Sequence, residues 1–129
     1  MMLSESAEDY LEAILILQNK KGQVRSIDIV SYLEFSKPSV STAMKRLRQN
    51  GYILMDEEGY ITLTASGRKI AEKIYERHQT IAEILHQLGV AKETALKDAC
   101  KIEHDISEES FQCMKAHYLN HKQINALPF

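Results

Sequence analysis

The sequence predicts a mainly α-helical protein that begins with a winged helix-turn-helix and continues as a purely helical region. Three observations support this prediction. Two helical patterns within residues 26–50 are joined by a short turn, two strand-like runs follow at 52–63, and apolar residues recur at helical spacing from 64 to 124. The 129 residues are enough for one domain or two small ones. We expect two, covering residues 1–65 and 66–129.

The composition is that of an ordinary globular protein, with 44% hydrophobic and 26% charged residues. The net charge of −2 excludes a polycation, so any contact with nucleic acid must come from a local patch. We find no signal peptide and no apolar run of membrane-spanning length. We therefore expect a cytoplasmic protein with reduced thiols and no contact with a membrane.

Residues 5–20 are predicted to form the first helix. Ser4 or Ser6 can supply its N-cap, and Gly22 favours the left-handed conformation that ends a helix. Asp9 and Glu12 are three residues apart and flank the apolar stripe of this helix. Their carboxylates are therefore able to face a neighbouring segment instead of bulk water.

Residues 26–34 are predicted to form a second helix, with Ser26 as its cap. Its buried positions are expected to be Ile27, Ile29, Val30 and Leu33. A third helix follows the turn and runs to about residue 50, with Pro38 in its first turn, where the missing N–H of proline is tolerated.

The third helix carries the residues that are predicted to contact DNA. Between residues 37 and 48 there are four basic residues and no acid, which gives a local charge of +4. The basic side chains are expected to reach phosphates, and the small polar ones to approach base edges in the major groove. The candidates are Ser36, Lys37, Pro38, Ser39, Ser41, Thr42, Lys45, Arg46 and Arg48. The alternative is a basic, solvated helix, because the loop at 56–59 is acidic and would not itself favour phosphate.

The strand-like runs at 52–55 and 60–63 are predicted to form the wing hairpin, with Gly59 in the positive-φ position of its loop. Thr64 can cap a long helix that ends near Gly89. Residues 92–104 and 107–124 are predicted to form two further helices. We expect Cys113 to belong to the core of this region.

Three side chains near residue 100 have the chemistry of metal ligands. Cys100, Glu103 and His104 lie at helical spacings of three and four, which places thiol, carboxylate and imidazole on one face. Together these groups suit a first-row divalent metal. Other segments must complete the coordination, and Asp9, Glu12 and His78 are the candidates. The alternative for each residue alone is a solvated acid or a capped histidine.

Five short segments resemble the diphtheria-toxin-repressor and manganese-transport-regulator family. They are residues 6–12 (SAEDYLE), 37–41 (KPSVS), 63–67 (LTASG), 77–78 (RH) and 99–104 (ACKIEH). The resemblance runs from about residue 5 to 122. It implies a metal-activated transcriptional repressor that controls iron or manganese homeostasis. It also implies a homodimer with a winged helix, a helical metal-binding and dimerisation domain, a palindromic double-stranded operator and no organic substrate.

The resemblance also implies a ligand set, namely Asp9, Glu12, His78, Cys100, Glu103 and His104. Asp9 matches the manganese branch of the family, where the iron branch has Met, whereas Cys100 matches the iron branch, where the manganese branch has Glu. The corepressor is therefore expected to be Fe²⁺ or Mn²⁺. We favour Fe²⁺ because a thiolate is a soft ligand, and Co²⁺ or Zn²⁺ can substitute. Ala82 and Leu96 replace two ancillary ligands of the iron branch, which argues against a second site of that kind.

Two other classes of protein remain as alternatives. One is a winged-helix regulator that responds to a small organic ligand or to oxidation of Cys100, and the other is a small metalloenzyme. The sequence contains no glycine-rich phosphate loop, no Gly-x-Ser-x-Gly and no His-Glu-x-x-His, so we do not expect an enzyme. His117 and His121 are four residues apart and are able to bind a metal, but we expect them to face solvent or a dimer interface.

Overall fold

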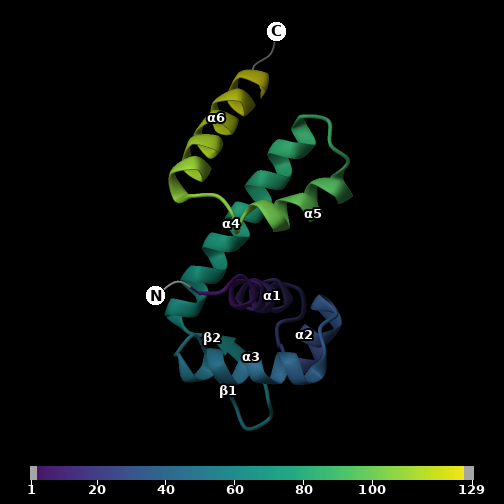
Figure 1. The fold of residues 1–129 in the computed structure, drawn as a ribbon, viewed down its shortest axis with the longest axis vertical. Helices are drawn as coiled ribbons and strands as arrows, with labels where there is room; N and C mark the ends of the chain where they lie inside the picture. Colours follow the sequence, from purple (N-terminus) through teal and green to yellow (C-terminus); the bar gives the residue numbers. More distant parts are fainter. Residues whose placement is uncertain (1–2, 127–129) are drawn as a thin grey trace. The chain divides into compact units, whose positions relative to one another are not determined.

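The computed structural model describes residues 3–126, and within them it contains six helices and one two-stranded antiparallel sheet (Figure 1). This confirms the predicted mainly α fold class with a winged helix-turn-helix. The chain divides into two compact units, Met1–Tyr75 and Glu76–Phe129. The boundary falls inside α4 (Ala65–Gln87), so this helix contributes residues to both units. None of the helices in the described range is both long and apolar enough to cross a bilayer.

Helix α1 (Glu5–Lys21) begins at the predicted residue and ends one residue later than predicted, before Gly22. The Ser4 hydroxyl accepts a hydrogen bond from the N–H of Ala7 at 3.2 Å. Gly22 has a φ of 84°, and its N–H donates to the carbonyl of Gln18. The helix carries a broad buried stripe, and Leu11 and Ile14 are fully buried in it.

Helix α2 (Ser26–Leu33) differs from the prediction in two details. Its N-cap is Arg25 rather than Ser26, because the Asp28 carboxylate accepts the N–H of Arg25 at 2.9 Å. The hydrogen bond from Lys21, together with that of Arg25, lowers the pKa of Asp28. Ile27 was expected to be buried and is 51% exposed. It lies about 200° round the helix from Ile29, which is fully buried, so the two side chains point in opposite directions.

Helix α3 (Lys37–Gln49) completes the helix-turn-helix. Glu34 makes the turn in the left-handed conformation, with a φ of 59°. The Ser36 hydroxyl then caps α3 by accepting the N–H of Ser39 at 3.2 Å. Along α3 the buried face consists of Val40, Met44 and Leu47.

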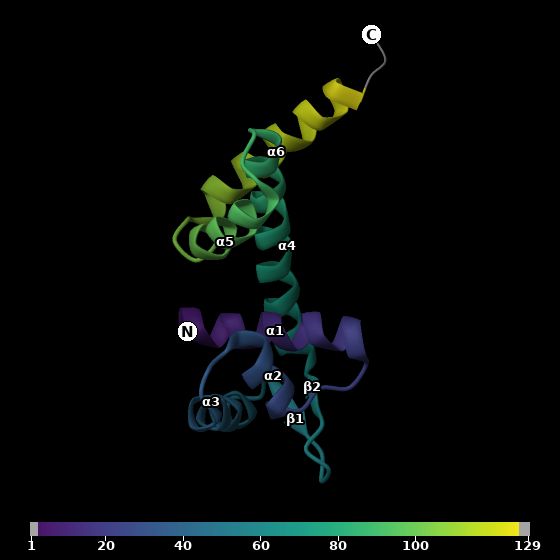
Figure 2. The same cartoon turned by 90° about the vertical axis from the view of Figure 1, so that its right-hand side faces the viewer.

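The wing is formed by β1 (Ile53–Met55) and β2 (Ile61–Leu63), which pair antiparallel with Leu54 opposite Thr62. In the connecting loop, Asp56 accepts hydrogen bonds from the backbone of Glu58 and Tyr60, and Gly59 has a φ of 86°. Figure 2 shows this loop extending away from the three helices of its unit. At the other end, Ile53 and Ile61 are buried and attach the hairpin to the core.

The start of α4 packs closely against the wing. Thr64 caps the helix by accepting the N–H of Gly67 at 3.2 Å, and its own hydroxyl donates to the carbonyl of Gly51 at 2.7 Å. A Cβ at Gly67 would lie 2.0 Å from the carbonyl oxygen of Tyr52. Glycine is therefore required at this position by close backbone approach rather than by an unusual φ.

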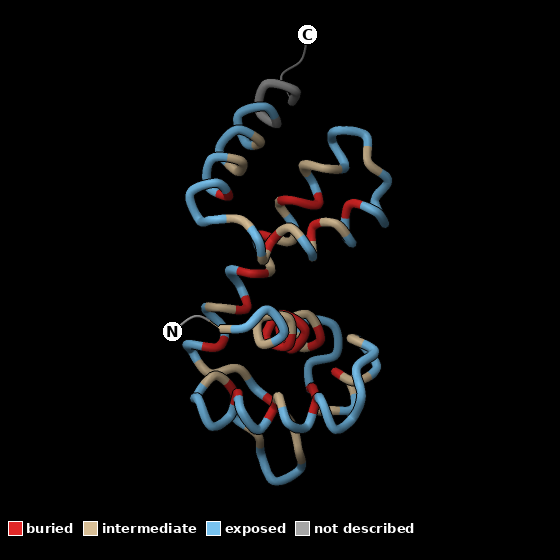
Figure 3. The backbone as a smooth tube through the Cα atoms, viewed as in Figure 1, coloured by how far each residue is buried: buried red, intermediate tan, exposed pale blue. Residues whose placement is uncertain are grey.

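Each unit has its own hydrophobic core, drawn as buried segments in Figure 3. In the second unit, α4 packs with α5 (Lys92–Ile102) and α6 (Glu108–Ala126) around Ile81, Ala99 and Phe111. Cys113 was expected in this core and is exposed instead. It lies two residues after Phe111, and this spacing puts it on the opposite face of α6.

Candidate metal centre and nucleic-acid interface

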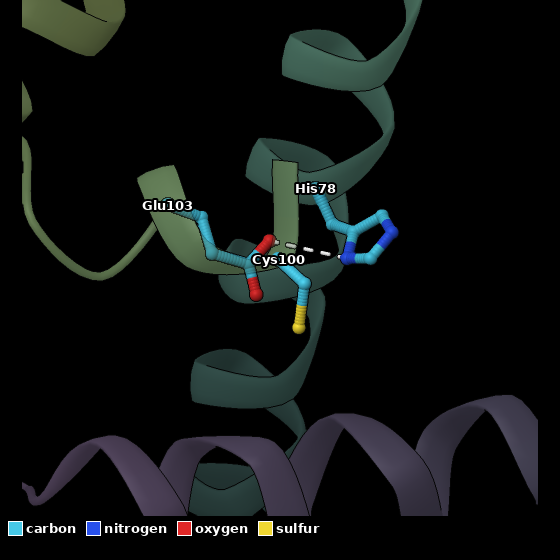
Figure 4. Close-up of side chains that lie close together, drawn as sticks. All are labelled: His78, Cys100 and Glu103. Atoms are coloured by element: carbon cyan, nitrogen blue, oxygen red, sulfur yellow. Dashed lines mark ion pairs between the residues drawn. The ribbon is translucent and has the colours of Figure 1, made fainter. Parts of the chain in front are cut away.

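Three ligand types meet in the second unit. His78 comes from α4, Cys100 from α5, and Glu103 from the residue that caps the end of α5. One ligand atom from each side chain lies within 4.8 Å of the others. Figure 4 shows the imidazole, the thiol and the carboxylate of these residues gathered together. The structure therefore brings together residues 22 positions apart that the sequence proposed as ligands.

The carboxylate of Glu103 is the centre of this cluster. The residue is fully buried, and its Oε2 atom lies 3.3 Å from Nδ1 of His78. Its other oxygen, Oε1, lies 3.5 Å from Nε2 of His104. A buried carboxylate requires compensating polar or positive neighbours, and two imidazoles flank this one.

These distances fit a divalent metal. Nitrogen and oxygen ligands bind such ions at about 2.0–2.2 Å, which puts two neighbouring ligands about 3.0–3.4 Å apart in octahedral or tetrahedral geometry. The 3.3 Å between His78 and Glu103 falls in that range. The donor set of nitrogen, sulfur and oxygen also suits a first-row transition metal. The residues present therefore fit the ion that the sequence implies.

Helix α5 ends at Ile102, two residues before the predicted end. Glu103 keeps helical angles (φ −58°, ψ −26°), and its N–H donates to the carbonyl of Ala99. Cys100 and Glu103 therefore keep the predicted helical spacing, which places their side chains on one face. His104 lies in the turn that follows, so its position depends on that turn rather than on the helix.

Arg77 holds this turn in place. One guanidinium nitrogen donates to the carbonyl oxygens of Glu103 at 2.8 Å and Ile106 at 3.3 Å, and the other pairs with Glu108 at 3.0 Å. The residue is only 8% exposed, and its guanidinium lies over the ring of Phe111. The sequence indicates no role for Arg77, because its partners lie 26 to 31 residues away. The only sequence signal was its position next to His78.

Asp9 and Glu12 lie one turn apart on α1, in the first unit. Glu12 is 6% exposed and Asp9 is partly buried. The carboxylate of Glu12 is therefore shielded from bulk water, as its place beside the apolar stripe suggested.

The exposed face of α3 presents the residues that the sequence assigned to DNA. All of them are exposed, whereas Val40, Met44 and Leu47 on the other face are buried. The exposed set is Ser36, Lys37, Pro38, Ser39, Ser41, Thr42, Lys45, Arg46 and Arg48. Acidic residues 56–58 occupy the tip of the wing. Positive charge is thus concentrated on α3 and not on the hairpin loop.

These two features define a class of protein: a winged-helix DNA-binding protein with a candidate metal centre in its helical second unit. Comparison with protein families identifies the class more closely. Residues 2–60 match the family described as iron dependent repressor, N-terminal DNA binding domain. Residues 64–124 match iron dependent repressor, metal binding and dimerisation domain. The chain belongs to the iron-dependent repressor family of metal-dependent transcriptional regulators, which confirms the resemblance found in the sequence.

Individual relatives agree with this assignment. The transcriptional regulator MntR of Escherichia coli O6:H1 is 38% identical over 111 residues, covering 86% of this chain and 72% of the relative. An uncharacterised HTH-type regulator of Methanocaldococcus jannaschii is 34% identical over 115 residues, covering 88% of this chain and 92% of that one.

Solved structures show the same fold. The crystal structure of T. acidophilum IdeR matches with a TM-score of 0.79 and 28% identity over 92% of this chain. A manganese-dependent transcriptional repressor in complex with manganese matches with a TM-score of 0.79 and 26% identity over 86% of this chain. The chain spans 55% and 51% of these two proteins, respectively, so it corresponds to about half of each.

Replacing Arg77 by Ala should destabilise the second unit by about 2–4 kcal/mol, because the buried carbonyl of Glu103 and the partly buried carbonyl of Ile106 would lose their donor. The matched control is Arg68→Ala, which removes an exposed pair with Glu72 on the same helix. Such a pair contributes at most about 1 kcal/mol. Urea unfolding of both variants, followed by circular dichroism, measures the difference. Equal shifts of the two midpoints would show that Arg77 does not stabilise the turn.

Proposed function

We propose that this protein represses transcription when a divalent transition metal binds Asp9, Glu12, His78, Cys100, Glu103 and His104. The observation that carries the proposal is the convergence of His78, Cys100 and Glu103 within 4.8 Å in the part of the chain that matches a metal-binding domain. Asp9 and Glu12 are included because of their helical spacing, the burial of Glu12 and the family resemblance.

The protein prepares this site with its own residues. Glu103 holds its carboxylate between two imidazoles, and Arg77 anchors the backbone of the same residue. The bound metal would supply the positive charge that stabilises the carboxylates, the imidazoles and the Cys100 thiolate at short range. Cys100 must lose its proton to take part, so binding is linked to proton release.

The regulatory mechanism that we propose is thermodynamic linkage. Asp9 and Glu12 belong to the DNA-binding unit, and the other proposed ligands belong to the second unit. A metal that needs ligands from both favours one conformation of the chain, and operator DNA favours the same one. A coupling free energy of about 1–3 kcal/mol would tighten DNA binding by about 5- to 150-fold.

The proposed target is double-stranded, palindromic operator DNA, bound in the cytoplasm by a homodimer. The match to a dimerisation domain supports the dimer. A two-fold symmetric dimer presents two recognition helices to two half-sites, which accounts for a palindrome. In each copy, Lys45, Arg46 and Arg48 would contact phosphates, while Ser39, Ser41 and Thr42 would approach the bases.

The proposed metal is Fe²⁺ or Mn²⁺, and Co²⁺ or Zn²⁺ can substitute. One solved relative is described as a manganese-dependent transcriptional repressor, and the matching family is described as iron dependent repressor, so both ions are consistent with the family. We favour Fe²⁺ because Cys100 offers sulfur, from which manganese gains least. Asp9 acts in the opposite direction, because a carboxylate is a hard ligand.

The first test removes one imidazole. His104→Ala should abolish the metal-stimulated part of DNA binding and leave a folded dimer, because the Glu103 carboxylate keeps only one of its two imidazole neighbours. Electrophoretic shift of a palindromic promoter fragment, with and without each metal, measures the response. His86→Ala, which alters an exposed histidine on α4, is the control and should respond as the unmodified protein does. If His104→Ala still responds at the same metal concentration, the proposed centre is wrong.

The second test concerns the recognition helix. Arg46→Ala should weaken binding to all DNA sequences and reduce the slope of log affinity against log salt by up to about one unit, because one phosphate contact is lost. Lys97→Ala removes an exposed positive charge from α5 and should leave the slope unchanged. Unchanged slopes in variants of Lys45, Arg46 and Arg48 alike would exclude α3 as the helix that binds DNA.

The third test concerns the choice of metal. If sulfur dominates, Cys100→Glu should shift activation toward Mn²⁺ and away from Fe²⁺. If the carboxylates dominate, Cys100→Glu should leave the relative activation by Mn²⁺ and Fe²⁺ unchanged, and Asp9→Met should alter it. Anaerobic titrations of DNA binding with each ion separate the two cases. Activation of the unmodified protein by Mn²⁺ at lower concentration than Fe²⁺, with no effect of Cys100→Glu, would contradict our preference for iron.

A further inference from the structure

Helix α6 carries three ligand-type side chains in one line. Cys113, His117 and His121 are separated by four residues each, so they follow one another along a single stripe of the helix. All three are exposed. Side chains four residues apart on a helix have Cβ atoms about 5–6 Å apart, close enough for two of them to bind one ion. None of these residues belongs to the centre on α4 and α5.

The two histidines are already arranged as a pair. Their ring centroids are 4.1 Å apart, and the planes are inclined by 36°. Nδ1 of His121 lies 3.2 Å from the carbonyl oxygen of His117. A carbonyl oxygen only accepts, so this hydrogen bond requires the proton on Nδ1 and leaves the lone pair of Nε2 available. Metal-binding histidines are oriented by a hydrogen bond of this type.

Contacts on the other side of α6 set its rotation. Phe111 is buried in the core of the second unit, Met114 packs against that core, and Tyr118 is partly buried. The Tyr118 hydroxyl donates to Glu83 at 2.5 Å, which raises the pKa of Tyr118 to about 12, and Lys115 pairs with Glu76. With this face held on α4, the stripe of Cys113, His117 and His121 is directed to solvent.

We propose that His117 forms a second metal site on α6 with one of its two neighbours in the stripe, His121 or Cys113, and that this site is selective for Zn²⁺ and chemically similar ions such as Co²⁺, Ni²⁺ and Cu²⁺. Imidazole and thiolate ligands suit these ions, whereas Mn²⁺ prefers oxygen ligands. Two ligands from one helix leave coordination positions open, which water or a second copy of the chain can fill. The site does not depend on the function proposed above.

His117 is the residue that tests this site most directly, because it belongs to both adjacent pairs, Cys113–His117 and His117–His121. Zinc is titrated against a chromophoric chelator with the full chain and with His117→Ala. The unmodified chain should bind one more zinc equivalent than the variant, or bind that equivalent at least about tenfold more tightly, since even outer-sphere partners of a metal contribute about 10- to 100-fold. His86→Ala, an exposed histidine on α4, should bind as the unmodified chain does.

Two further measurements separate this site from the centre at Cys100. The number of Mn²⁺ equivalents should be the same with and without His117→Ala. In a Cys100→Ser chain, a Co²⁺ thiolate-to-metal absorption band that Cys100→Ser/Cys113→Ser loses identifies the Cys113–His117 pair, and binding that requires His117 without this band identifies the His117–His121 pair. Circular dichroism checks that the variants are folded; Cys113 and His117 are exposed, whereas Cys100 is partly buried.

Sizing chromatography with added zinc shows what completes the coordination. A larger species that requires His117 supports the site with a second copy supplying ligands, and an unchanged size with zinc bound supports it with water. The proposal is overturned if His117→Ala binds as many zinc equivalents, with the same affinity, as the unmodified chain.

Discussion

The second unit depends on the burial of one carboxylate. Glu103 is fully buried, and its two oxygens face the imidazoles of His78 and His104 while its backbone carbonyl accepts from Arg77. A charge in such a place is tolerated only when its neighbours compensate for the lost hydration. One residue is therefore both a candidate ligand and the point at which the turn after α5 is attached to α4. A metal bound to the Glu103 side chain would therefore also affect the turn that Arg77 holds through the Glu103 backbone.

Helix α4 combines structural roles that proteins often assign to separate elements. Near its start, Gly67 allows the helix to approach the backbone of the wing, and Ala71 is buried in the first core. Further along, Arg77 and His78 serve the candidate metal centre, and Ile81 is buried in the second core. Because one continuous helix contributes to both units, a change in its position or curvature would alter side-chain packing in each of them.

Sequence reasoning predicted most of the fold because local chemistry decides most of its boundaries. Ser4 and Thr64, both predicted as caps, accept hydrogen bonds from residues only three positions away, and the structure shows that Ser36 caps α3 in the same way. It failed where a helix face had to be inferred from few residues: Ile27 and Cys113 are exposed, since each lies two positions from the residue that points to the core. In the candidate site, spacing grouped Cys100 with Glu103. The hydrogen bonds of Arg77 to the carbonyls of Glu103 and Ile106 could not be predicted from the sequence. Every residue has a backbone carbonyl, so neither periodicity nor composition indicates which one accepts a hydrogen bond.

The uneven charge of the first unit has a consequence for the approach to DNA. The chain carries a net charge of −2, yet residues 37–48 of α3 carry +4, and residues 56–58 at the wing tip include three acids. In the field of a polyanion such a distribution experiences a torque that turns α3 toward the duplex and the acidic tip away from it. Encounters would therefore be oriented before any base is contacted. Added salt should then slow association as well as weaken the complex, because screening removes the orienting force first at long range.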